Sequence, residues 1–222
     1  MAAFGAEACR LSEVLADVDE ADFARSSPCP PWAVLELLCH MRIGVGRVAG
    51  MLAEPEPPQG PLVPAPGYYR PDRRFSAAVN SDRIEAAQRM ASGLAGSAAV
   101  RDFGRAWRHA VVLIQGAPQE RIVVTRHGDR MLLTEFLRTR VLELAVHGLD
   151  LAAGLRRPPW TTDTAAAVVQ GLLLSDEAAD ALRRESGWDQ VTLIAKATGR
   201  LPVNPAGKAL MERHGLRQLA LS

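Results

Sequence analysis

The sequence lacks the features that mark several protein classes. Cysteine occurs only three times, without a Cys-x-x-Cys pair, which fits a reducing compartment better than a disulfide framework. The formal net charge is only +1, which gives no electrostatic basis for binding nucleic acid or an anionic membrane. No apolar run approaches the length of a membrane span, and Glu7 falls where a signal peptide would need an apolar core. We therefore expect a soluble cytoplasmic protein.

Lysine is almost absent as well. Of the 26 lysine and arginine residues only Lys196 and Lys208 are lysines, and alanine, valine and glycine are abundant. This bias is typical of translation from a GC-rich genome, such as those of actinobacteria. The hydrophobic fraction of 48% and the charged fraction of 23% are ordinary for a globular protein and argue against disorder. A chain of 222 residues is long enough to build one well-packed core.

The most informative stretch covers residues 134–154, TEFLRTRVLELAVHGLDLAAG. It predicts one long helix that is apolar around most of its circumference and therefore lies at the centre of the molecule. Glu143 and His147 are four residues apart and share one face of this helix, with Asp150 one turn further along. Burying a carboxylate and an imidazole is costly without a binding partner. A divalent metal would satisfy both groups at once.

Helical periodicity predicts four other helices in the first half of the chain, over residues 4–18, 32–52, 75–94 and 98–116. Pro30 and Pro31 suit the opening positions of the second helix, where a missing N–H group costs nothing. The segment RIVVTRHGDRMLL predicts a small hairpin. The proline-rich segment 54–72 cannot be helical, and we expect it to cross the bundle and lie over a cleft, ending with Tyr68 and Tyr69.

Two or three shorter helices are expected after the central helix, over residues 162–185, 188–198 and 204–214. The predicted fold class is mainly α: a helical bundle with long connections, a small β-hairpin and a helical C-terminal extension. We expect the bundle to span residues 1–157 and the extension, residues 158–222, to pack on it.

His40 is the best third ligand for the predicted metal, because bundle metal sites are formed by side chains that project inward from facing helices. Gly44, one turn away, leaves room beside its imidazole. Three ligands of mixed nitrogen and oxygen type leave one coordination position open, as in catalytic zinc sites. The alternative is that a helical Glu–His pair and a single helical histidine have ordinary surface or structural roles.

A resemblance adds to this pattern. The segment CPPWAVLELLCHM resembles CPGWTVRDLVAHL of the mycothiol-dependent maleylpyruvate isomerase family, which lies in the DinB-like superfamily of metal-binding four-helix bundles. The segment RVLELAVHGLDLAAGL is similar to the second signature of that family, Arg-x-x-Glu-x-x-x-His-x-x-Asp-Leu. The resemblance implies a DinB-like bundle in which His40, Glu143 and His147 bind Zn²⁺ or another divalent metal. Pro31 departs from the glycine of the family pattern, and the C-terminal segment is shorter than the further domain that the isomerases carry.

The resemblance also implies an activity. The thiol mycothiol would occupy the open metal position, where coordination deprotonates it, and the sulfur would attack a small electrophile for S-transfer or isomerisation. Two alternatives remain: a metal-dependent hydrolase that uses zinc-bound water, and a non-catalytic metal- or ligand-binding bundle. We expect no nucleic-acid or membrane partner. The oligomeric state, monomer or homodimer, is open.

Residues around the expected site have secondary roles in this interpretation. Asp150 is either an acceptor that orients a ligand imidazole or a partner of Arg156 or Arg157 at the helix end. Arg47 either binds a carboxylate of the cofactor or substrate or is simply solvated. Tyr68 and Tyr69 either line a pocket or pack beneath the loop. We expect Cys39 in the core, and His109 and His127 in surface or structural positions.

Overall fold

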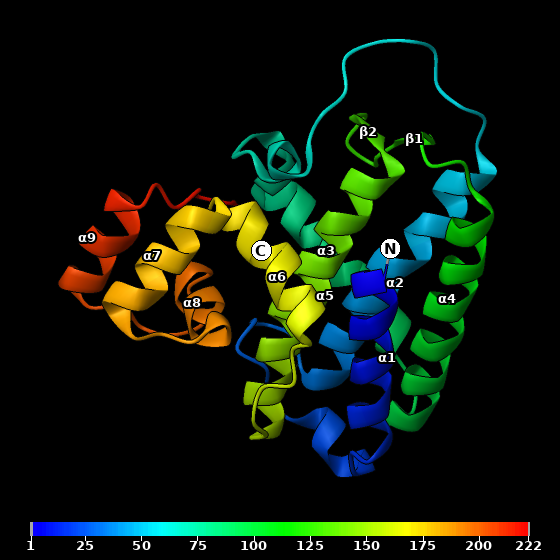
Figure 1. Cartoon of the computed structure of the whole chain (residues 1–222). Coiled ribbons are helices and arrows are strands. Elements are labelled where there is room, and N and C mark those ends of the chain that lie inside the picture. Colours follow the sequence, from blue (N-terminus) through cyan, green and yellow to red (C-terminus); the bar gives the residue numbers. More distant parts are fainter. Residues whose placement is uncertain (1, 222) are drawn as a thin grey trace.

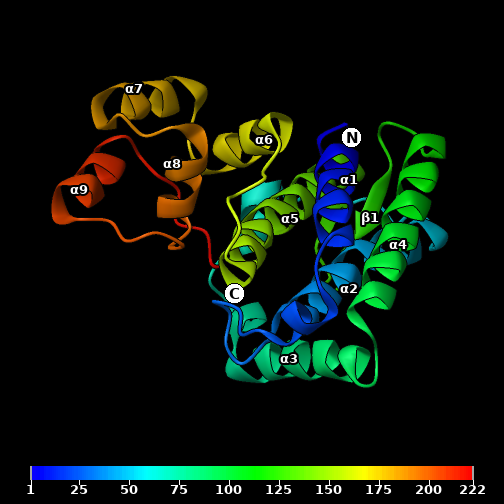
Figure 2. The same cartoon turned by 90° about the horizontal axis from the view of Figure 1, so that it is seen from below.

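Helix α5 (Leu133–Leu155) lies at the centre of the protein, and most of its residues are buried. The computed structural model describes residues 2–221. Four long helices, α1, α2, α4 and α5, run side by side, with α3 beside α2, while the shorter helices α6–α9 form a group beyond α5 (Figures 1 and 2). The mainly helical class predicted from the sequence is confirmed.

The α-helices have these bounds: α1 Ala2–Ala16, α2 Val34–Ala53, α3 Ala77–Ala91, α4 Gly96–Gly116, α5 Leu133–Leu155, α6 Asp163–Leu173, α7 Asp176–Ser186, α8 Gln190–Ala197 and α9 Pro205–Arg213. Short 3₁₀ helices are η1 Glu20–Ala24, η2 Ala65–Tyr69 and η3 Arg73–Phe75. The hairpin pairs β1 (Ile122–Val124) with β2 (Arg130–Leu132) in antiparallel register. None of the described helices has the length and apolar character that crossing a membrane requires.

Two predictions about helix boundaries were wrong. Pro30 and Pro31 do not open α2 but lie in a turn before it, closed by a hydrogen bond from the Trp32 N–H to the Cys29 carbonyl (3.0 Å). The segment predicted as one helix over residues 162–185 is two helices, because the Ser175 side chain caps the first turn of α7 and so restarts the helix. This break lets α7 turn away from α6.

The segment between α2 and α3 is irregular, as predicted, except for the 3₁₀ turns η2 and η3. Its end is held against the bundle, because the Glu135 carboxylate accepts from the Ala65 N–H (2.7 Å) and the Tyr69 ring is fully buried. The Val63 N–H also bonds to the Arg130 carbonyl of β2 (2.8 Å). The loop therefore delivers Tyr68 and Tyr69 to the side of α5.

The C-terminal helices are joined to the bundle through α6, which packs on α1 and α5, and through α8, which contacts α5 and α6. The Glu7 carboxylate of α1 accepts hydrogen bonds from the Thr162 N–H (2.8 Å) and hydroxyl (2.7 Å) at the start of α6. Beyond α9 the chain returns, and the Ala220 N–H bonds to the Tyr69 carbonyl (3.0 Å). The extension thus contacts the loop that reaches α5.

Candidate metal centre

Three side chains from two neighbouring helices converge at the middle of the bundle. His40 projects from α2, and Glu143 and His147 project from consecutive turns of α5. Each offers a ligand atom, and these atoms all lie within 4.8 Å of one another. The His40 and His147 rings meet edge to face with centroids 5.2 Å apart, and His147 Nε2 lies 3.5 Å from Glu143 Oε2. The structure therefore brings together the three residues chosen from the sequence.

The electrostatics of this cluster keep nitrogen and oxygen lone pairs available. Burial, and next the charge of His147, lower the pKa of His40 to about 3, so its imidazole is neutral at neutral pH. Burial would raise the pKa of Glu143, but its bond to His147 and the charge of Arg140 outweigh this and lower it. Burial would lower the pKa of His147, but its hydrogen bonds, first to Asp150, raise it strongly. The cluster thus combines the ionised carboxylate of Glu143 with a proton on His147 that a bound metal would displace.

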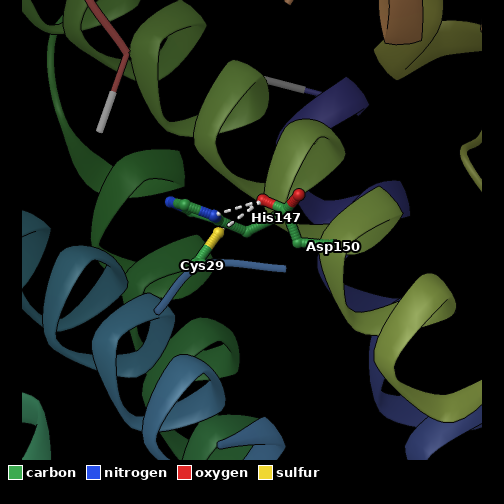
Figure 3. Close-up of side chains that lie close together, drawn as sticks. All are labelled: Cys29, His147 and Asp150. Atoms are coloured by element: carbon green, nitrogen blue, oxygen red, sulfur yellow. Dashed lines mark hydrogen bonds and ion pairs between the residues drawn. The ribbon is translucent and has the colours of Figure 1, made fainter. Parts of the chain in front are cut away.

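Asp150 orients His147 from the side opposite Glu143. Its Oδ2 lies 3.0 Å from His147 Nδ1 and also accepts from the Cys29 thiol at 3.2 Å (Figure 3). Arg200, just after α8, binds both carboxylate oxygens of Asp150 at 3.1 Å. A carboxylate that accepts from Nδ1 directs the Nε2 lone pair toward a metal. Of the two roles considered for Asp150, the structure shows the contact with an imidazole, and its arginine partner is Arg200 rather than Arg156 or Arg157.

Aromatic rings complete the wall around the three side chains. Trp32 stacks on His40 with ring centroids 4.6 Å apart. The buried hydroxyl of Tyr69 donates toward the Thr139 carbonyl (2.9 Å) and Glu143 Oε1 (3.1 Å). These contacts fix the rotamers of His40 and Glu143, which is what a preformed site needs.

A cavity of about 180 Å³ opens beside the three side chains and is unusually rich in arginine. Arg47, Arg83, Arg126 and Arg140 line it, and none of the salt bridges among the described residues includes any of them. Burial, and next the charge of Arg126, lower the pKa of Arg47. Asp82 and Glu143 also line the cavity, but the arginines outnumber these carboxylates, so the space beside the three side chains is suited to a negatively charged group.

Gly44 allows one of these arginines to reach the cavity. A Cβ atom at this position would lie 3.2 Å from Arg140 Nη1. Arg140 is only 6% exposed, stacks over Tyr68 and Phe136, and has no hydrogen-bond partner at Nη2. The sequence indicated that Gly44 leaves room beside His40, and in the structure this room adjoins the guanidinium of Arg140.

Other predicted residues fall in and outside the site. Tyr68 and Tyr69 line the cavity together with Arg47. His127 also lines it, so the prediction of a surface or structural position was incomplete. His109 is exposed on α4, and Cys39 is buried in the core, as predicted. Sequence reasoning missed Cys29, although the match to the Cys-Pro-x-Trp segment could have drawn attention to it.

The donor set fits a divalent metal. Two imidazoles and a carboxylate are the ligands of a zinc site with an open position, and zinc ligands lie about 3–4 Å apart because each bond is near 2 Å. The separations in the cluster need only small side-chain adjustments to reach that spacing. Asp150 supplies the carboxylate acceptor that usually supports a metal-binding histidine.

Comparison with known proteins gives consistent matches. The family model described as mycothiol maleylpyruvate isomerase N-terminal domain matches residues 4–152. Crystal structures of the mycothiol-dependent maleylpyruvate isomerase and of a histidine-to-alanine mutant match 76% of this chain, with TM-scores of 0.53 and 0.54 at 18% and 15% sequence identity. The chain spans 65% of the length of those two chains. No curated protein matches. The structural likeness, at this identity, establishes a shared fold.

Proposed function

Because the chain belongs to the mycothiol maleylpyruvate isomerase N-terminal domain family, we propose that it is a metal-dependent enzyme that uses a low-molecular-weight thiol. The thiol is mycothiol, and the reaction is S-transfer to a small electrophile or its isomerisation. The observation that carries this proposal is the convergence of His40, Glu143 and His147 beside an arginine-rich cavity, in which four of the arginines form no salt bridge with a described residue.

His40, Glu143 and His147 would hold the metal, zinc by the chemistry of the donor set. A bound divalent metal would supply Lewis acidity that lowers the pKa of a coordinated thiol. The neutral His40 and the ionised Glu143 are already in the protonation states of metal ligands. The Asp150 carboxylate accepts a hydrogen bond from the Nδ1–H of His147 and so fixes the imidazole.

The arginines of the cavity beside His40, Glu143 and His147 orient the reactants in this proposal. Arg47 and Arg126 reach the cavity from α2 and from the hairpin, and a guanidinium binds carboxylates through two parallel N–H donors. In this proposal they pair with the acidic groups of the thiol or of the electrophile. Tyr68 forms part of the wall and carries the ring over which the Arg140 guanidinium lies.

The test measures metal content and thiol binding together. Zinc-loaded protein should bind mycothiol far better than metal-free protein, with release of close to one proton near neutral pH, because free thiols are mostly protonated there. Calorimetry in buffers of different ionisation enthalpy counts the protons. His147→Ala should abolish both zinc and thiol binding, whereas the matched control His109→Ala, at an exposed histidine of α4, should change neither.

The outcomes separate the alternatives. Thiol binding that ignores the metal, or that releases no proton, refutes the thiol mechanism. Substrate turnover without added thiol would assign the site to a hydrolase. Full zinc occupancy in His147→Ala would show that the ligand set is wrong.

A further inference from the structure

A second, larger cavity of about 660 Å³ lies between the bundle and the C-terminal helices. Its walls come from the turn before α2, from α3, from the end of α5, and from α8 with the loop after it. Among the described residues it shares only Arg83 with the lining of the arginine-rich cavity. The volume is within the range of about 300–1,000 Å³ that is typical of small-molecule sites.

The walls of this cavity are mainly apolar. The apolar side chains in its lining are Pro28, Pro30, Trp32, Ile84, Leu149, Ala152, Ala153, Pro159, Val191, Ala195 and Leu201. Such a surface favours an apolar ligand body, because burying apolar area contributes about 25 cal/mol per Å². A small and highly polar molecule would leave these walls without contacts.

The charged groups of the cavity do not balance. Asp150 is the only carboxylate among the described lining residues, and it is bound to Arg200. Arg157 donates to the Val14 and Asp17 carbonyls and Arg83 to the Arg74 carbonyl and the Asn80 side chain, and neither forms a salt bridge with a described residue. Two guanidinium charges in the wall thus have no matching anion.

Two buried donors in the same lining are also unsatisfied. Trp32 is only 6% exposed, and its indole Nε1 has no hydrogen-bond partner among the described residues. Arg83 Nε also has no hydrogen-bond partner among the described residues. An unpaired buried donor costs about 1–3 kcal/mol. Both atoms have almost no surface that is accessible from the cavity, so a ligand contacts them only if the two side chains shift.

We propose that this cavity binds an apolar small molecule that carries one acidic group. The acidic group faces the guanidinium groups of Arg83 and Arg157, and the apolar body packs against the prolines and the side chains of α5 and α8. A medium-chain or aromatic carboxylate has this chemistry. Binding at this site requires neither the metal nor the thiol, so this proposal can be refuted without refuting the proposed activity, and the reverse also holds.

The experiment uses the fluorescent apolar anion 8-anilinonaphthalene-1-sulfonate with the full-length protein, metal-free and zinc-loaded. It should bind with one-to-one stoichiometry in both forms, and decanoate should displace it at least about tenfold more effectively than decanol, because only decanoate pairs with the arginines. Two outcomes overturn the proposal: absence of saturable binding, and equal displacement by decanoate and decanol.

Variants locate the site. Thr192→Trp fills the cavity from α8 and should abolish binding, whereas Ala209→Trp adds the same ring at an exposed position of α9 outside the cavity and should not. Arg157→Gln should weaken binding about tenfold, while its neighbour Arg156→Gln, outside the lining, should leave it within about twofold. Circular dichroism and the unfolding temperature check that each variant is folded. Unchanged binding by folded Thr192→Trp and Arg157→Gln proteins would refute the assignment.

Discussion

Replacing Asp150 by asparagine tests whether the proposed metal centre depends on its supporting carboxylate. The side chain keeps its size, but an amide offers only one acceptor oxygen. If that oxygen accepts from His147 Nδ1, the amide N–H groups face the guanidinium of Arg200, and if the amide turns round, His147 loses its acceptor. In the first arrangement Arg200 Nε loses its acceptor, and in the second the buried His147 Nδ1 does.

The expected effect is a zinc affinity that is about 10–100-fold lower, which is usual when the acceptor behind a metal-binding histidine is removed. At a free zinc concentration of about 100 Kd for the native protein, zinc adds about 2.7 kcal/mol to the free energy of unfolding. The same concentration would add only about 0.4–1.4 kcal/mol to Asp150→Asn. The zinc-dependent rise in unfolding temperature should therefore be smaller by roughly 3–9 °C for a chain of this length.

Competition with a chromophoric chelator gives the zinc affinity, and thermal unfolding with and without zinc gives the stability difference. Asp102→Asn is the control, since Asp102 pairs with Arg42 (2.6 Å) between α2 and α4, away from the site. A zinc affinity within twofold of the native value would refute the reasoning. An equal loss of stability in the metal-free and zinc-loaded proteins would show that Asp150 only supports the fold.

Three further predictions concern the scaffold. Burial raises the pKa of Glu7 despite its hydrogen bonds to the start of α6, so its favourable contribution is present at low pH and is lost as the pH rises through the folded pKa. Glu7→Gln should therefore gain stability relative to the native protein as the pH rises above about 4.5, which urea unfolding would measure. Burial, and next nearby carboxylates, raise the pKa of Cys39 to about 11. Iodoacetamide at about pH 8.5 should therefore label Cys39 in guanidinium but not in the native protein, which peptide mass spectrometry would show. Gly96→Ala would place a methyl group on the buried Phe23 ring and should destabilise by about 1–3 kcal/mol, whereas Gly50→Ala, with open space around it, should stabilise by about 0.5–1 kcal/mol in urea unfolding.

Regular periodicity explains which parts of the fold were predictable. The central helix was expected over residues 134–154 and is observed as Leu133–Leu155, because its apolar circumference leaves no other arrangement. The break between α6 and α7 was missed, because Ser175 is a cap only if the chain turns there, and the turn depends on tertiary packing. The division of the chain at residue 157 stays a prediction.

The residues of the candidate site could also be predicted only in part from the sequence. Spacing within one helix was enough to place Glu143 and His147 on one face. The position of His40 inside another predicted helix made it the best third ligand, and the family pattern then supported that choice. Cys29 and Arg200 could not be selected in this way, because they lie 121 and 50 residues from Asp150 in the sequence and reach it only through the fold. Side chains that converge from irregular segments leave no periodic signal.

The contact between Asp150 and Arg200 also sets an order of assembly during synthesis. The ribosome makes His40, Glu143 and His147 before it makes Arg200, and chains begin to fold from the N-terminal side. Until α8 docks, the Asp150 carboxylate lacks its guanidinium partner, and its hold on His147 competes with water. Docking of the last helices completes the wall of the large cavity and adds the Arg200 bonds to the carboxylate that contacts His147. A nascent chain would contain His40, Glu143 and His147 before the contacts that fix their positions had formed.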